Sequence, residues 1–309
     1  MNHKDTKNTK NAILLVVAWF LAADVGCAPS NAPIGTTLVY EVDKAAVEQD
    51  ADIAAKVVDV LNRRINPGRR PMAQVRRLDG GRIEVGIYGN DAEKAKRVQQ
   101  IADRSGTLEF RVLATRHDDL ALVERALAEP DRRALKDATG VVEARWVPVT
   151  PKGEKSFAGD PQLATRQPKP GGLEVLVKID AYNVTGDYLK QVAVGVDRYA
   201  KPTVSFQFNA TGGKLFGGLT NANLPTEGFS RRLGIILDGD LYSAPTIHSA
   251  IYDRGEITGN FSHEEVEDLV RVLNAGSLPA KIVLVEKRES KDAGGTVVHP
   301  PLSPKSPDP

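Results

Sequence analysis

A hairpin centred on Asp238-Gly239-Asp240 constrains the fold of this chain more than any other stretch. Two apolar runs, Leu233–Leu237 and Leu241–Ala244, flank it. Asp-Gly between β-forming runs is a strong signal for a tight primed turn, because glycine adopts a positive φ at little cost. Pro245 has no backbone N–H to donate and therefore ends the second strand. The stretch predicts a two-stranded antiparallel hairpin.

A third strand and a capped helix are predicted to follow this hairpin. Glu256–Gly259 is strand-like, and Ser262 is followed by Glu265 three residues later. This spacing is that of a capping box, in which each side chain satisfies a free backbone N–H at the start of a helix. These patterns alone predict a hairpin, a strand and a helix, and they indicate no chemistry.

The residues of this stretch closely resemble the first periplasmic domain of SecD, the auxiliary membrane subunit of bacterial protein export. The residues that carry the resemblance here are Leu237, Asp238, Gly239, Ser243, Ala244, Pro245, Gly259, Asn260 and Phe261. It continues through Leu278-Pro279-Ala280 and has an earlier block in Leu38–Val42 and Val57–Asn66. The resemblance implies an α+β fold, with a base subdomain and a head subdomain, and a structural role for these motif residues.

Residues 31–114 are expected to form a ferredoxin-like base with the order β-α-β-β-α-β. Leu38, Tyr40 and Val42 alternate as in a strand, and the apolar residues from Val47 to Ile65 recur at helical spacing. A hairpin around Asp79-Gly80-Gly81 and a second helix capped by Asp91 follow. Leu108, Phe110 and Val112 alternate again, and they predict the last strand of this unit.

The rest of the chain is expected to fall into three parts. Residues 115–172 predict a helix ending near Pro130, a short polar helix, a strand and an exposed proline-rich loop from Pro148 to Gly172. Residues 173–289 predict the head, and from Val204 onward the order is again roughly β-α-β-β-α-β. The division into base and head in the family that the chain resembles implies that pieces of both halves build one subdomain. Its first helix carries four glycines, so it is weak by itself or packs very closely on its sheet. Residues 290–309 are polar and proline-rich, and disorder is expected.

The first 30 residues are typical of a signal peptide or membrane anchor. A basic start precedes the apolar run Ala12–Ala23, which at about 1.5 Å per residue spans roughly 18 Å, less than a bilayer core of ~30 Å. Val25-Gly26-Cys27 is similar to the end of a lipobox, although Asp24 stands where that pattern has an aliphatic residue. Lipid attachment at Cys27, an uncleaved anchor and release all remain open. An exported, membrane-anchored domain on the periplasmic side is expected.

No pattern in the chain indicates an enzyme, a metal site or a cofactor. The five histidines are scattered, and Thr211-Gly212-Gly213-Lys214 lacks the upstream glycine and the following Ser or Thr of a phosphate loop. Ser230 lacks the second glycine of a nucleophile elbow, and the Asp238/Asp240 pair is better explained by turn chemistry.

Charge adds one open question. The 41 basic and 40 acidic residues give a net charge of +1, which provides no general attraction to nucleic acid. Six arginines nevertheless cluster without an acidic neighbour, and they either face anionic lipid headgroups or lie on a solvated helix end. They are Arg63, Arg64, Arg69, Arg70, Arg76 and Arg77.

The resemblance implies a non-catalytic function in export. A membrane-tethered domain of this kind is expected to bind unfolded or translocating polypeptide, beside subunits of the Sec translocon, by strand addition or through apolar head surface. The alternative is a structural or regulatory envelope lipoprotein that keeps the fold and does not act with the translocon.

Overall fold

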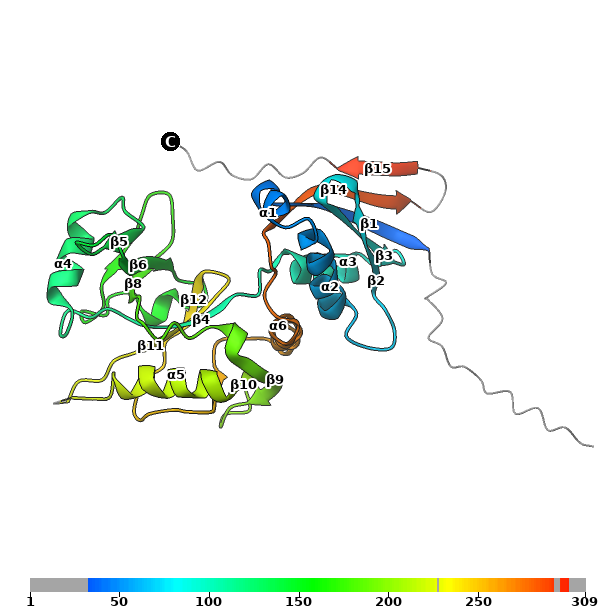
Figure 1. Ribbon diagram of the computed structural model, residues 1–309. Coiled ribbons are helices and arrows are strands. Elements are labelled where there is room, and N and C mark those ends of the chain that lie inside the picture. The colour runs from blue at the N-terminus through cyan, green and yellow to red at the C-terminus, as the bar shows by residue number, and fades with distance from the viewer. Residues whose placement is uncertain (1–32, 227, 292–294, 300–309) are drawn as a thin grey trace, which may run out of the picture.

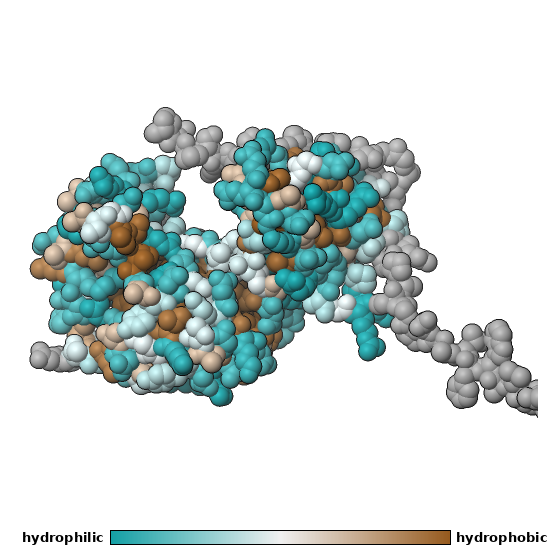
Figure 2. Space-filling view, in the orientation of Figure 1, coloured by the Kyte–Doolittle hydropathy of each residue, from teal (hydrophilic) through white to brown (hydrophobic). Residues whose placement is uncertain are grey.

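The computed structural model describes residues 33–226, 228–291 and 295–299, which form two bodies that touch each other (Figure 1 and Figure 2). We call them the base and the head. The expected α+β class is confirmed, because both bodies contain helices and antiparallel sheet. The leader with Cys27 lies outside the described residues.

The base is a five-stranded antiparallel sheet with two helices on one face. Strand order is β15-β14-β1-β3-β2, and apolar side chains of α2 and α3 fill the core beneath Leu38, Tyr40 and Ile83. The elements are β1 (Ile34–Val42), α1 (Lys44–Gln49), α2 (Ile53–Ile65), β2 (Ala73–Leu78), β3 (Arg82–Tyr88), α3 (Ala92–Asp103), β14 (Ile282–Lys291) and β15 (Gly295–His299). Without β15, this is the ferredoxin-like arrangement, with β14 as its fourth strand.

The prediction that Leu108–Val112 closes the base sheet was wrong. This segment is strand β4, but it pairs with β11 (Leu233–Leu237) in the head, from Leu233 opposite Val112 to Leu237 opposite Leu108. β14 takes its place beside β1, with Tyr40 opposite Leu284. The whole head is therefore inserted between α3 and the last strand of the base.

Three small antiparallel sheets build the head. Their orders are β12-β11-β4, β13-β10-β9 and β5-β6-β8-β7. The strands are β5 (Ala134–Lys136), β6 (Val142–Pro148), β7 (Thr165–Arg166), β8 (Glu174–Lys178), β9 (Leu189–Val196), β10 (Pro202–Phe208), β12 (Asp240–Ser243) and β13 (Arg254–Ile257). Because β10 pairs with β9 and β13 while β11 pairs with β4 and β12, the predicted second β-α-β-β-α-β unit does not exist.

Helices α5 (Ala210–Asn221) and α6 (His263–Ala275) position the head core. Phe110, Phe206, Phe208 and Phe216 meet there with ring centroids 5.0 to 6.3 Å apart. Helix α6 lies between the two bodies (Figure 1). It contributes Leu269 and Leu273 to the head core but Val272 to the base core, so one helix packs against both.

The middle of the chain is more ordered than its composition predicts. The helix ending before Pro130 is present as α4 (Leu120–Ala128), but the polar helix after it is absent among the described residues, where β5 stands instead. The predicted exposed loop from Pro148 to Gly172 buries Phe157, Leu163 and Ala164 against the β6–β8 sheet. The predicted disordered tail was also wrong in part, since β14 continues to Lys291 and β15 pairs with it.

Candidate functional site

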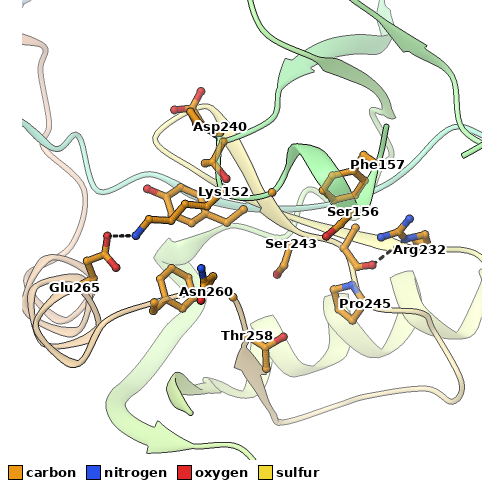
Figure 3. A pocket seen from close by; sticks show the side chains of 17 residues that line it. Lys152, Ser156, Phe157, Arg232, Asp240, Ser243, Pro245, Thr258, Asn260 and Glu265 are labelled. Atoms are coloured by element: carbon orange, nitrogen blue, oxygen red, sulfur yellow. Dashed lines mark hydrogen bonds and ion pairs between the residues drawn. The ribbon is translucent and has the colours of Figure 1, made fainter. Parts of the chain in front are cut away.

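The strongest candidate site is a cleft of about 690 Å³ in the head, which we call the motif cleft. Three segments line it: residues 150–157, residues 240–245 on and after β12, and residues 258–265 leading into α6 (Figure 3). Six of the nine motif residues meet here, although the sequence separates them into two groups. They are Ser243, Ala244, Pro245, Gly259, Asn260 and Phe261.

The primed turn places the second segment. Asp238 and Gly239 have φ values of +54° and +91°, so β12 folds back on β11 with Leu237 opposite Asp240. After β12, the Leu233 N–H donates to the Pro245 carbonyl at 2.8 Å, which keeps the chain beside β11. The predicted turn chemistry is what presents Ser243 and Pro245 to the cleft.

The capping box places the third segment. The Ser262 side chain accepts from the Glu265 N–H at 3.1 Å, and Glu265 accepts from the Ser262 N–H at 2.8 Å. Glu265 also pairs with Lys152 of the first segment at 2.6 Å, across the rim of the cleft (Figure 3). Burial opposes ionisation of Glu265, but the hydrogen bonds from Lys152 and from the Ser262 backbone outweigh it and lower its pKa.

The cleft has aromatic walls and an unsatisfied hydroxyl. Tyr242 and Phe261 stack with centroids 5.8 Å apart, and the Arg232 guanidinium lies 4.7 Å from the centre of the buried Phe157 ring. Ser243 Oγ is buried at the cleft without a hydrogen-bond partner in the described part of the chain. Aromatic rings with a free polar group suit an extended peptide, which offers apolar side chains and backbone hydrogen-bonding groups.

The remaining motif residues have other positions. Leu237 lies in the head core, and Asp238 faces the connection to the base. Its Oδ1 accepts from Ser105 Oγ at 2.7 Å and from the backbone N–H groups of Gly106 and Thr107 at 2.6 and 3.1 Å. Partial burial, and then the nearby Asp238 carboxylate, raise the pKa of Asp240 above its ordinary value.

Sequence reasoning placed Arg64 in the arginine cluster but did not predict its role, which is to hold the connection between the bodies. Its side chain is fully buried, and it donates to the carbonyls of Arg104, Ser105 (2.8 Å) and Gly276 (2.7 Å). Burial lowers the pKa of Arg64 to about 10, opposed by the nearby Asp238, so the guanidinium stays charged at neutral pH. The arginine cluster therefore does not form one surface patch, because Arg64 points inward and Arg76 pairs with Glu84 at 2.7 Å.

Two further features were searched for among the described residues: a metal site and a membrane-spanning helix. Among them, no group of three or more His, Cys, Asp and Glu side chains is placed to hold a metal ion. Within the same ranges no helix has the length and apolar character needed to cross a membrane.

Comparison with known proteins relates the chain to SecD. Residues 162–280 match the family model of the SecDF P1 head subdomain. The protein translocase subunit SecD of Aquifex aeolicus (strain VF5) is 30% identical over 256 residues, which cover 82% of this chain and 43% of that protein. SecD of Elusimicrobium minutum (strain Pei191) is 30% identical over 271 residues, covering 82% and 51%. The chain thus spans about half the length of the curated relatives it matches.

A solved structure gives the same result for the fold. The structure reported as that of "a membrane component SecDF that enhances protein export" is 25% identical, with a TM-score of 0.54, over 81% of this chain and 98% of that chain. The resemblance drawn from the motif residues is confirmed.

Proposed function

Because residues 162–280 match the SecDF P1 head subdomain and most of the chain is similar to SecD, we propose that this protein binds unfolded or translocating polypeptide and assists Sec-dependent protein export without catalysis. Its partners in this proposal are the exported chain and subunits of the Sec translocon. Its position is the extracytoplasmic side of a membrane, to which the N-terminus attaches it, with Cys27 as the lipid-attachment residue.

The motif cleft is the observation that carries this proposal. It gathers the two motif segments that carry the resemblance, and its aromatic walls and the free Ser243 Oγ match the chemistry of an extended peptide. The Lys152–Glu265 pair that crosses its rim joins two exposed side chains, and such a pair contributes under about 1 kcal/mol. A bound segment can therefore displace it at small cost.

Titration of the purified full-length chain with a fluorescent, reduced and permanently unfolded polypeptide tests the function. We expect a micromolar dissociation constant, or about −8 kcal/mol, because ordering a flexible segment offsets much of the contact energy. The folded form of the same polypeptide should bind at least about tenfold more weakly, since it offers no extended segment.

A variant that fills the cleft tests the location. Thr258 lines the cleft and is exposed, so Thr258→Trp should block binding without disturbing a core. Val141, an exposed apolar residue outside the cleft lining, gives the matched control Val141→Trp. Equal affinity for folded and unfolded polypeptide, or no binding of either at millimolar concentration, would favour the envelope-lipoprotein alternative.

A further inference from the structure

Strand β9 forms an open edge of its sheet. It pairs with β10 on one side and, within the part of the chain that the structure describes, with no strand on the other, in the order β13-β10-β9. Its second half, Ala193–Val196, carries no charge, and Val194 and Val196 are 43% and 65% exposed. An unpaired edge of this kind presents a row of backbone donors and acceptors to any extended chain.

The hydrogen-bond pattern shows which backbone groups are open. In an antiparallel strand, the N–H and C=O of one residue point to the same side, and this side alternates along the chain. Asn274 of α6 binds both groups of Val192, accepting from its N–H at 3.1 Å and donating to its C=O at 2.8 Å. The same groups of Val194 and Val196 therefore point outward too, and no hydrogen bond to them is formed within the described residues.

A groove of about 600 Å³ reaches this edge at Val194. Val270 and Ala275 of α6 and Pro67 after α2 also contribute apolar surface to its lining. Val194 lies opposite the buried Val204 of β10, so its side chain is on the core face of the sheet. A strand added to β9 would continue this face over the groove and cover apolar surface that is now exposed.

Two other edge strands carry charges that discourage pairing. Edge strand β2 includes Arg76 and Arg77, and edge strand β13 includes Arg254 and Glu256. Charged side chains on an edge strand are the usual protection against pairing with another chain. The second half of β9 has no such protection, and the Asn274 side chain closes only the first position of the open edge.

The charge of the groove indicates the kind of partner. Arg63 and Arg271 line it, and Arg271 has no ion-pair or hydrogen-bond partner among the residues described. Glu267, the acidic side chain of the groove, is already paired with Arg97 at 3.1 Å. The groove therefore has an uncompensated positive charge beside an apolar strip.

We propose that the open edge of β9 is a second binding site, which takes an extended polypeptide segment as an added strand. The segment carries apolar side chains at alternate positions and a carboxylate side chain that meets Arg271. Backbone hydrogen bonds to Val194 and Val196 hold the segment, and alternate side chains enter the groove. This inference rests on the proposed function for the class of ligand, but it assigns a different surface.

The test uses a fluorescein-labelled, acetylated nonapeptide with valine at every second position, serine between, and one glutamate. Its anisotropy is followed during titration with the full chain. A second peptide carries N-methyl groups on the alternate amides that would donate to β9, and a third has lysine in place of glutamate. Val194→Lys/Val196→Lys is the edge variant, Val141→Lys is its matched surface control, and Thr258→Trp blocks the motif cleft.

We expect the N-methylated peptide to bind about tenfold or more weakly, since two backbone hydrogen bonds are lost. The edge variant should weaken binding by a similar factor, because it removes apolar contacts in the groove and places charge on the edge strand. Val141→Lys and Thr258→Trp should leave the affinity for this peptide within about twofold. The lysine peptide should bind more weakly to the normal chain and regain affinity for Arg271→Glu.

Several results would overturn the assignment. Equal binding of the N-methylated peptide rules out strand addition, and loss of binding on Thr258→Trp alone moves the peptide to the motif cleft. A dimer that dissociates on Val194→Lys/Val196→Lys, in the absence of peptide binding, assigns the edge to a second copy of the chain. No binding of the nonapeptide up to about 1 mM rejects the β9 site. That result leaves the motif cleft untouched, because titration with unfolded polypeptide tests the cleft separately.

Discussion

At the scale of single residues, the buried guanidinium of Arg64 links the two segments that connect the base with the head. Arg64 comes from α2 of the base, and its acceptors are the carbonyls of residues 104 and 105 on the outgoing segment and Gly276 on the returning one. Gly106 has a φ of +77°, and a Cβ there would overlap the Arg64 guanidinium. The planar guanidinium, with five donors in a rigid fork, can serve three such acceptors at once.

Replacement of this residue should destabilise the whole chain. Arg64→Met would remove all three hydrogen bonds and leave the Arg104 and Gly276 carbonyls without the donor they have now, while the Ser105 carbonyl keeps the Leu278 N–H at 2.8 Å. We expect the free energy of unfolding to fall by about 3 kcal/mol or more. Arg63→Met, next in sequence, removes one hydrogen bond to the Ala275 carbonyl at 3.1 Å and should cost about 1 kcal/mol. Urea denaturation of both variants measures the difference, and equal losses would contradict the role given to Arg64.

Glu265 gives a prediction about pH. Its pKa in the folded chain is lowered below the ordinary 4.5, so its contribution to stability is present above pH 4.5 and is lost as the pH falls through the folded value. Glu265→Gln should therefore lower the free energy of unfolding at pH 7 by about 0.5–1 kcal/mol. This difference in free energy between the variant and the normal chain should disappear in acid. Glu264→Gln, one residue away and outside the capping box, is the control. A difference in the free energy of unfolding that stays constant down to pH 3 would contradict this prediction.

At the scale of elements, helix α5 shows why a helix tolerates four glycines. A Cβ at Gly213 would meet the Tyr252 carbonyl oxygen, one at Gly217 would meet the Tyr252 ring, and one at Gly218 would meet the Tyr182 ring. The glycines therefore let the helix approach neighbouring backbone and aromatic rings very closely. Of the two explanations that the sequence left open for this helix, close packing is the one the structure supports.

The two kinds of contact on α5 should respond differently to alanine. Alanine favours a helix by about 1 kcal/mol over glycine, but Gly213→Ala meets backbone that cannot move and should lower the free energy of unfolding by about 1–3 kcal/mol. At Gly217 the obstacle is the Tyr252 ring, which is 60% exposed and can rotate away, so Gly217→Ala should be nearly neutral. Thermal unfolding of both variants checks this ranking, and the reverse order would refute it.

Local signals in the sequence predicted elements well, but they did not predict which strands share a sheet. The Asp238-Gly239 turn and the Ser262/Glu265 capping box depend on neighbouring residues, and both have the expected geometry. Strand β4 was recognised and yet assigned to the wrong sheet, because its partner β11 lies more than 120 residues further along the chain. Phe157 looked like part of a loop because its neighbours are polar, and only tertiary contacts bury it.

The candidate site could be predicted only in part for the same reason. The motif residues were identified, but their meeting with residues 150–157 depends on contacts between distant segments. The sequence around Arg64 predicted an exposed side chain, because an arginine in a basic run normally lies at the surface. In the structure this side chain is buried.

At the scale of the whole molecule, the base depends on a strand from the far end of the chain. β14 lies between β1 and β15, and residues Ile282 to Glu289 pair with β1. A chain that ends at Lys281 therefore loses the fourth strand of the ferredoxin-like sheet and exposes the edge of β1, while every strand of the head remains.

We expect this shortened chain to keep a folded head and lose a stable base. Amide hydrogen exchange should be rapid in β1, β2 and β3 and slow in β4, β10 and β11, because local stability follows the contacts that remain. A chain that ends at Lys291, which removes β15 and keeps β14, is the control and should protect both bodies. Protection of β1–β3 in the shorter chain would show that β14 is dispensable.

The return of β14 to β1 also sets an order of events during synthesis. A chain that emerges from its N-terminus makes β1, β2 and β3 first, yet the sheet they belong to stays incomplete until residues 282–291 appear. All strands of the head emerge in between, and they need no partner from outside residues 108–257. The body that is encoded first is thus the last to be completed, and during that interval β1 presents an unpaired edge to whatever surrounds the nascent chain.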